Sequence, residues 1–220
     1  MCGRFVLLTD LSVIVQSFDI QDVACDFKPG HNLSPGREIA AIIREGQNRL
    51  VCRRWGLIPA WAKDPSIGNR MFNARAETIA EKPSFKDAFQ KRRCLIPADG
   101  FYEWQKVGKM KKPFQFSLKS REPFGFAGLH ETWISPEKRA IHTCTIITTE
   151  PNDLVRPIHD RMPVILPKEQ EAAWIDPDNH NPKELLTLLK PYPSDEMTMS
   201  PVDPGWLYKP QAEASALIGS

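Results

Sequence analysis

Apolar residues recur along the chain in short runs between turn-forming residues, and this pattern predicts more strands than helices. Within residues 10–18 the apolar positions recur at helical spacing, and Asp10 stands where an N-cap belongs, so this segment is predicted to form a short helix. The apolar residues 5–7 just before it predict a strand that anchors the N-terminus inside the fold.

The middle of the chain is rich in predicted strands. They are expected at residues 39–43 and 50–55, which flank a turn at 45–48, and then at 94–97, 100–104, 114–118, 124–129, 142–149 and 162–166. Helices are expected at residues 82–89, with Pro83 near the start, and at 168–174 and 182–189. The proline-rich end from residue 191 is predicted to be irregular.

This order of elements predicts an α+β fold with a curved or barrel-like, mostly antiparallel sheet and flanking helices. Nothing in the pattern places a domain boundary, so residues 1–220 are interpreted as a single domain, with a core over about 2–205. The 20 prolines favour turns and edge strands over a helical bundle.

Composition limits the classes of function. The net charge of +2 is too small to indicate nucleic-acid binding by itself. No run is long enough to span a membrane, and the N-terminus lacks the basic region and cleavage site of a signal peptide. The 5 cysteines are odd in number and form no CxxC pair, so neither a disulfide framework nor a zinc site is suggested. A reducing, cytoplasmic setting fits best.

Cys2 directly follows the initiator methionine. If Met1 is removed, Cys2 carries a thiol and a free α-amine on adjacent carbons, and both are partly available as nucleophiles near neutral pH. An aldehyde would form an imine with the amine, and the thiolate would then close a five-membered thiazolidine. A cysteine at a disordered terminus is the alternative. The apolar residues that follow favour an anchored one.

Two tryptophans flank the segment Gly56-Leu57-Ile58-Pro59. Trp55 is interpreted as a core residue. Trp61 follows the proline and precedes a polar loop, where an exposed indole would stack on a base or wedge into a nucleic-acid stack.

Polar groups are dense in residues 72–78. In an extended segment Asn73, Arg75 and Glu77 share one face, which suits either a solvated surface strand or a site in which Asn73 orients an oxygen and Arg75 binds a phosphate. Glu103 lies between aromatic residues. It is either part of a surface alternation, which the strand alone favours, or a buried acid with a raised pKa suited to proton transfer.

His159 lies in a proline-bounded loop beside an acid and a base. A lone histidine is more often structural, but loops that enter strands often carry sites. Thr148, at the end of the preceding predicted strand, is expected to approach this loop.

Together these segments resemble the SRAP family, the SOS-response-associated peptidase-like proteins that shield abasic sites in DNA. The matching segments are Met1-Cys2-Gly3-Arg4-Phe5, Asn32-Leu33-Ser34-Pro35-Gly36, Trp55-Gly56-Leu57-Ile58-Pro59, Asn73-Ala74-Arg75-Ala76-Glu77-Thr78, Pro97-Ala98-Asp99-Gly100-Phe101-Tyr102-Glu103-Trp104, Thr148-Thr149 and His159-Asp160-Arg161-Met162-Pro163. They occur in order from residue 1 to about residue 205.

The resemblance implies covalent attachment of Cys2 to an abasic site in single-stranded DNA through a thiazolidine. Glu103 is then the catalytic glutamate that shuttles protons, His159 assists opening of the deoxyribose ring, and Asn73 positions the site near Cys2. β-Elimination with strand cleavage is an expected side reaction, and self-removal of Met1 is a further one.

The resemblance also implies a set of DNA contacts. The expected DNA-binding residues are Arg4, Asn32, Trp61, Arg75, Thr148 and Arg161. Ala62 stands where several family members carry a second aromatic residue, which predicts weaker binding or an altered junction preference. No cofactor, metal or membrane is implied. The protein is expected to act as a monomer, associated with the nucleoid if bacterial, beside unidentified replication or repair proteins.

Three other functions remain open from the residues alone. An N-terminal Cys-Gly also begins glutamine amidotransferase domains, in which the thiol attacks an amide. Cys2, Glu103 and His159 would also suit a thiol peptidase acting on Met1 or on other proteins. A non-enzymatic nucleic-acid-binding module would bind without Cys2 and be released by salt.

Overall fold

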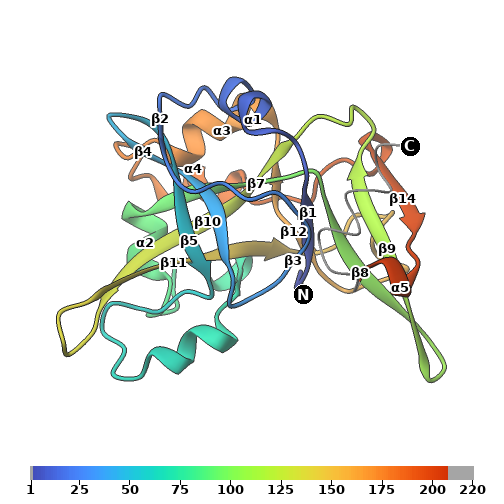
Figure 1. Cartoon of the computed structure of the whole chain (residues 1–220), viewed down its shortest axis with the longest axis horizontal. Coiled ribbons are helices and arrows are strands. Elements are labelled where there is room, and N and C mark those ends of the chain that lie inside the picture. Colours follow the sequence, from blue (N-terminus) through green and yellow to red (C-terminus); the bar gives the residue numbers. More distant parts are fainter. Residues whose placement is uncertain (1, 208–220) are drawn as a thin grey trace.

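Two sheets make up the fold in the computed structural model, which describes residues 2–207 and, for Trp206, the backbone alone. The first sheet has the order β14-β9-β8-β1-β3 and the second the order β12-β11-β10-β7-β4-β5-β2. Figure 1 shows the first sheet in the right half of the molecule and most of the second in the left half, with β12 beside β1 and β3.

The first sheet consists of β1 (Phe5–Leu7), β3 (Gly30–Leu33), β8 (Gly100–Val107), β9 (Met110–Leu118) and β14 (Met197–Pro201). The second consists of β2 (Asp22–Ala24), β4 (Glu38–Glu45), β5 (Gln47–Trp55), β7 (Arg93–Ala98), β10 (Phe124–Ile134), β11 (Ala140–Thr149) and β12 (Met162–Pro163), with β6 (Asn73–Arg75) paired to β11 and β13 (Ile165–Leu166) paired to β10. The helices are α1 (Leu11–Ser17), α2 (Lys86–Lys91), α3 (Lys168–Ile175), α4 (Pro182–Thr187) and α5 (Pro204–Leu207), with 3-10 turns at Pro65–Arg70, Ala76–Thr78 and Ser194–Glu196.

The second sheet closes into a barrel. β5 pairs antiparallel with β4 and also parallel with β11, so that β11, β10, β7, β4 and β5 form a ring. The predicted turn between β4 and β5 is present, and Gly46 occupies it with a φ of 75°, a left-handed conformation that favours glycine. The predicted barrel-like α+β fold is therefore confirmed, although β2, β5 and β6 each form a parallel pairing.

One continuous apolar core joins the two sheets. Phe5 on β1 packs edge-on against Trp55, with ring centroids 5.3 Å apart, and against Phe126, with centroids 5.9 Å apart. All three side chains are fully buried, which confirms the core interpretation of Trp55. Burial of each contributes about 1.5–3 kcal/mol to stability, so β1 is held firmly against the barrel.

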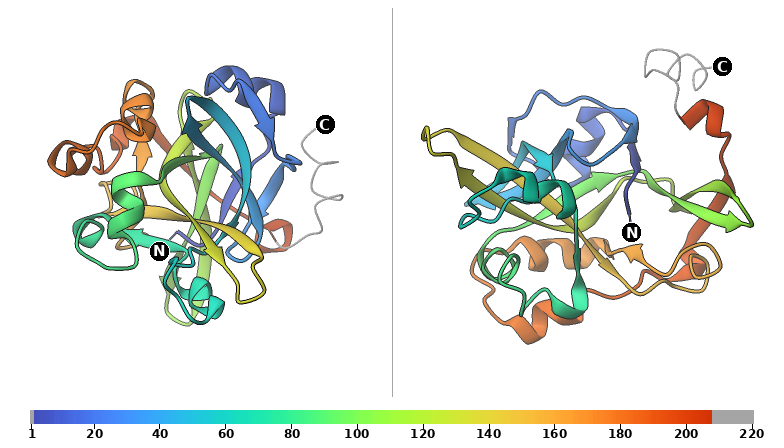
Figure 2. Two further views of the ribbon diagram at one scale, coloured as in Figure 1. Left: turned by 90° about the vertical axis from the view of Figure 1, so that its left-hand side faces the viewer. Right: turned by 90° about the horizontal axis from the view of Figure 1, so that it is seen from below.

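Arg93 holds helices to the outside of the barrel. Its buried guanidinium donates 5 hydrogen bonds to backbone carbonyl oxygens in α2, in the last turn of α3 and in the loop after α3. Carbonyls in the last turn of a helix lack intrahelical partners, so a rigid cation with several donors suits these positions. Figure 2 shows the resulting arrangement, in which α3 and α4 lie on a different side of the molecule from the β8–β9 hairpin.

Three local predictions are wrong in detail. The helix expected at 82–89 begins only at Lys86, because residues 82–85 form a turn closed by the Phe85 N–H to the Lys82 carbonyl. The end of the chain is not wholly irregular, since β14 pairs along β9. Glu77 does not continue the strand of Asn73, because the chain turns into a 3-10 helix after Arg75.

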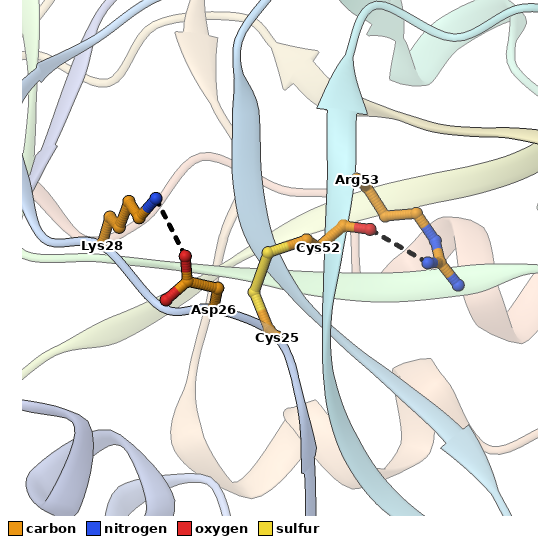
Figure 3. Close-up of a disulfide and its surroundings, with 5 residues drawn as sticks. All are labelled: Cys25, Asp26, Lys28, Cys52 and Arg53. Atoms are coloured by element: carbon orange, nitrogen blue, oxygen red, sulfur yellow. Dashed lines mark hydrogen bonds and ion pairs between the residues drawn. A yellow bond between two sulfur atoms is a disulfide. The ribbon is translucent and has the colours of Figure 1, made fainter.

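A disulfide links Cys25 to Cys52, with the sulfur atoms 2.08 Å apart (Figure 3). The cysteine count did not suggest it. The parallel pairing of β2 with β5 places Ala24 beside Val51, so the next residue of each strand is also adjacent. Cys2, Cys94 and Cys144 are buried free thiols.

Among the residues that the structure describes, no helix is long and apolar enough to cross a membrane.

Candidate active site

The strand β1 places Cys2 inside the protein. β1 lies between β3 and β8, with Phe5 opposite both Leu33 and Phe101. The far end of β1 is fixed by Asp99, whose carboxylate accepts hydrogen bonds from the backbone N–H groups of residues 8 and 9 and from the Thr9 hydroxyl. The Cys2 side chain is fully buried as a result, so the terminus is anchored, as its apolar neighbours predict.

Burial raises the pKa of the Cys2 thiol well above its usual value, and the negative charge of Glu103 adds to the shift. The thiol is therefore protonated near neutral pH. A reaction at this sulfur needs a neighbouring group that accepts the proton as the sulfur bonds to carbon.

Glu103 is such a neighbour. Its position on β8 next to β1 leaves it 3% exposed, so the surface interpretation is wrong. The sequence favoured an exposed position for Glu103 because a strand pattern does not show which segments cover it. Here the end of β1 and the loop of His159 cover this part of β8. Burial raises the pKa of Glu103 to about 8, so the carboxyl is largely protonated at neutral pH and is ready to act as a general acid.

His159 completes the group. Its Nε2 lies 3.8 Å from a carboxyl oxygen of Glu103, and its Nδ1 lies 3.0 Å from both the Asp160 carboxylate and the backbone nitrogen of Arg161. Burial lowers the pKa of His159, which favours the neutral imidazole. The Asp160 carboxylate and the Arg161 carbonyl, 3.2 Å from Nδ1, both accept hydrogen bonds, so a neutral ring with its proton on Nδ1 turns the lone pair of Nε2 toward Glu103 and the cleft.

The loop that carries His159 is tied to the 3-10 turn after β6. The guanidinium of Arg161 donates two hydrogen bonds to Glu77, at 2.7 and 2.9 Å, and one of 2.7 Å to the Thr148 carbonyl. Bidentate pairing of this kind fixes orientation as well as distance. The imidazole is therefore held by the two residues that follow it in the chain, Asp160 and Arg161.

A cleft of about 400 Å³ opens at these groups. Its lining residues are Gly3, Arg4, Glu103, Trp104, Lys106, Lys111 and His159. A larger hollow of about 540 Å³ lies between α1 and α3, but it has no cysteine or histidine in its lining. With three cationic side chains and a largely protonated acid, the smaller cleft suits an anionic ligand.

Arg4 and Asn32 form a connected pair at this cleft. Arg4 donates a hydrogen bond of 2.8 Å to the Asn32 side-chain oxygen, and the Asn32 amide donates one of 2.6 Å to the Leu207 carbonyl. The structure thus brings these two predicted DNA-binding residues together beside Cys2.

Asn73, Arg75 and Thr148 lie on the adjacent β6 and β11 and are not part of the cleft lining. The Asn73 amide donates to the Phe72 and Ile146 carbonyls, while its buried side-chain oxygen has no hydrogen-bond donor among the described residues. Arg75 is exposed, and the buried Thr148 hydroxyl donates to the Ala74 carbonyl. Their predicted contacts with a ligand remain predictions.

Trp61 is 60% exposed, in agreement with a residue available for stacking. Ala62, in contrast, is buried against Ile58 and Trp133, and its carbonyl accepts a 2.7 Å hydrogen bond from the Trp133 indole. In this chain position 62 therefore contributes to packing rather than to the surface.

Sequence reasoning missed four residues of the site: Trp104, Lys106, Lys111 and Asp160. The four lysines within residues 106–112, shortly after Glu103, were a usable signal in the sequence. Among residues 2–207, no group of three or more His, Cys, Asp and Glu side chains is arranged to hold a metal ion.

Comparison with known proteins shows the family of this chain. The family model described as "SOS response associated peptidase (SRAP)" matches residues 1–205. The abasic site processing protein YoqW of Bacillus subtilis is 50% identical over 201 residues, covering 90% of each chain. The abasic site processing protein HMCES of Rattus norvegicus is 32% identical over 216 residues, covering 80% of this chain and 61% of the rat protein.

A crystal structure of a protein from Bacteroides thetaiotaomicron superposes with a TM-score of 0.89 at 27% identity, covering 96% of each chain. The sequence family and the fold therefore coincide over nearly the whole chain, and the protein belongs to the SRAP family.

Proposed function

We propose that this protein processes abasic sites in single-stranded DNA by forming a covalent crosslink through Cys2. The observation that carries the proposal is the meeting of Glu103 and His159 at a cationic cleft lined also by Gly3, directly after the buried Cys2, whose thiol lies close enough to feel the charge of Glu103. The names of its relatives, which are abasic site processing proteins, support the choice of substrate. The same chemistry suits a role in shielding damaged DNA during an SOS response.

The proposed reaction begins after removal of Met1, which frees the α-amine of Cys2. The open-chain sugar of an abasic site presents an aldehyde, and the amine nitrogen bonds to its carbon to give a carbinolamine. Loss of the hydroxyl as water leaves an imine. The thiol sulfur then bonds to the same carbon while the imine nitrogen gains a proton, which gives a thiazolidine with the net loss of one water.

Each side chain has a defined task in this scheme. Protonated Glu103 donates the proton that accompanies the departing hydroxyl, and its carboxylate then accepts the thiol proton. Neutral His159 takes the hydroxyl proton of the closed sugar, which opens the ring. Asn73, through its side-chain oxygen, accepts a hydrogen bond from the sugar. An imine at this carbon also acidifies the neighbouring position, so strand cleavage by β-elimination accompanies slow ring closure.

An abasic nucleotide suits the cleft because it lacks a base. It has already lost stacking, so placing it in the cleft costs little. Arg4, Asn32, Arg75, Thr148 and Arg161 are proposed to contact the neighbouring backbone or sugar. Trp61 stacks on a flanking base.

Intact mass spectrometry tests the proposal. The purified protein is measured before and after incubation with a single-stranded oligonucleotide that carries one abasic site. Protein without Met1 is expected to gain the oligonucleotide mass minus one water, in an adduct that survives denaturation. Cys2→Ser keeps the amine but not the sulfur, so it separates a reversible imine from the thiazolidine. Absence of an adduct from protein with a free Cys2 amine would overturn the proposal.

Thiol peptidase activity is less well supported. Hydrolytic cysteines are activated by a lowered pKa, whereas burial raises the pKa of Cys2. Self-removal of Met1 is tested in cells that lack methionine aminopeptidase. Wild-type protein would lose Met1 and Glu103→Gln would retain it.

A further inference from the structure

The hairpin of β8 and β9 extends beyond the rest of the first sheet. β1 pairs with β8 only near its start, at Gly100 and Phe101, and β14 pairs with β9 only from Phe114 onward. Among the described residues, 105–112 therefore form strand pairs only with each other. Figure 1 shows this end of the hairpin at the lower right, and Figure 2 shows it clear of the body from a second direction.

This two-stranded end is strongly basic. It carries Lys106, Lys109, Lys111 and Lys112, and residues 104–118 contain no aspartate or glutamate. All four lysines are exposed. Within residues 2–207 none of them forms an ion pair with an acidic side chain. The four ammonium groups therefore face solvent, and they do not stabilise this part of the fold through ion pairs.

Two of the lysines face each other at the cleft. Lys106 lies directly opposite Lys111 across the hairpin, and both line the cleft with Glu103 and His159. Like charges directly opposite on paired strands are destabilising, and within residues 2–207 neither lysine has an ion-pair partner. An anion bound between the two ammonium groups would convert this repulsion into attraction.

We propose that the β8–β9 hairpin is a binding arm for the phosphate backbone of the DNA strand that carries the abasic site. Lys106 and Lys111 hold the phosphate beside the abasic nucleotide, and Lys109, nearer the tip of the hairpin, contacts the strand farther out. This inference rests on the proposed function, and it adds a phosphate contact and a direction for the strand. The positive charge and the continuity with the cleft select a polyanionic strand as the occupant.

The first experiment measures the salt dependence of binding in a Cys2→Ala background, where no crosslink forms. The probe is a labelled single-stranded oligonucleotide with one tetrahydrofuran abasic analogue, followed by fluorescence anisotropy. Each lost phosphate contact removes about 0.7 from the slope of log K against log salt. Lys106→Gln/Lys111→Gln is therefore expected to reduce the magnitude of that slope by about 0.7, because both lysines hold one phosphate, and to weaken binding most at low salt.

A matched control removes the same charge elsewhere. Lys183 and Lys190 are exposed and lie in and after α4, away from the hairpin in both views (Figures 1 and 2). Lys183→Gln/Lys190→Gln is expected to keep the wild-type slope. Equal slopes for the hairpin variant, the control and the parent would overturn the proposal.

The second experiment tests direction. Oligonucleotides with nucleotides on only the 5′ side or only the 3′ side of the abasic analogue are compared. The loss of affinity in the hairpin variant is expected with one of the two and not with the other. An equal loss of affinity with both oligonucleotides would show that the lysines attract DNA without fixing the direction of the strand. This result would overturn the proposed binding arm.

Crosslinking separates failure of the arm from failure of the proposed chemistry. At saturating DNA, Lys111→Gln is expected to reach the wild-type adduct yield. The DNA concentration that gives half of the maximal crosslinking rate is expected to be higher for this variant than for wild type. Lys111→Gln serves here because Lys106 also acts on the pKa of His159. If wild type forms no adduct but the slope still falls, the chemistry fails and the arm stands. A lower saturating rate at unchanged half-saturation would assign Lys111 to the chemistry and overturn its role in the arm.

Discussion

Replacement of Glu103 by glutamine is expected to remove a pH-dependent loss of stability. An unfolded carboxyl has a pKa of 4.5, and burial raises that of folded Glu103 to about 8. Because the folded pKa is raised, the unfolded state ionises first as pH rises. Folding stability contributed by this group therefore decreases through the window from pH 4.5 to about 8.

The size of the effect follows from these two pKa values. Within this pH window, each pH unit lowers the free energy of unfolding by at most about 1.4 kcal/mol. Between about pH 5 and pH 7, the ionised unfolded carboxyl lowers the free energy of unfolding by about 2.5 kcal/mol. Glutamine does not ionise, so the stability difference between Glu103→Gln and wild type is expected to grow by this amount.

Urea denaturation at several pH values measures the difference directly. Glu137→Gln makes the same chemical change at an exposed position and is expected to track wild type. His159 lies close to Glu103 and titrates in the opposite sense, since its lowered folded pKa raises stability as pH increases. Repeating both measurements in a His159→Ala background separates the two groups.

A Glu103→Gln difference that changes by less than about 0.5 kcal/mol across this range would refute the reasoning. Such a result would mean that Glu103 ionises normally in the folded state. It would then be unable to supply a proton near neutral pH.

Three further predictions concern other parts of the molecule. Cys52→Ser opens a loop with a sequence separation of 27 and is expected to lower the free energy of unfolding by about 3–4 kcal/mol, and reductant should destabilise wild type but not the variant. Arg93→Met leaves five backbone carbonyls without their buried donor and should cost at least about 3 kcal/mol in urea unfolding, against a smaller loss for Arg93→Lys. Trp61→Ala is expected to weaken DNA binding by about 1–3 kcal/mol. Because Trp61 is exposed, unfolding should change by less than about 0.5 kcal/mol, and a larger change would show a structural role instead.

Local pattern was sufficient for most of the secondary structure. The run at 5–7, the β4–β5 hairpin and the strands from Arg93 to Thr149 follow from residue periodicity and turn residues, which act over a few neighbours. Where local preference was weak, prediction failed. Tertiary pairing with β9 makes a strand of residues 197–201, in a segment that reads as irregular.

The site residues were identified in a different way. Cys2 is evident from chemistry alone, because only an N-terminal cysteine offers an amine and a thiol on adjacent carbons. Glu103 and His159 were recognisable through the family resemblance, while the strand itself pointed Glu103 to the surface. A role for Lys106 and Lys111 could be assigned only from the fold, which places both side chains at the cleft.

By itself, then, the sequence determined the order of most elements, the family resemblance and the reactive residue at the start of the chain. Only the tertiary structure decided which groups are buried and which meet. Burial of Glu103, its 3.8 Å approach to His159, the Cys25–Cys52 bond and the lysine pair at the cleft all join residues far apart in the chain or on opposing strands. The pKa of Glu103 depends on the solvent that these contacts exclude, and periodicity along one strand carries no information about what covers it.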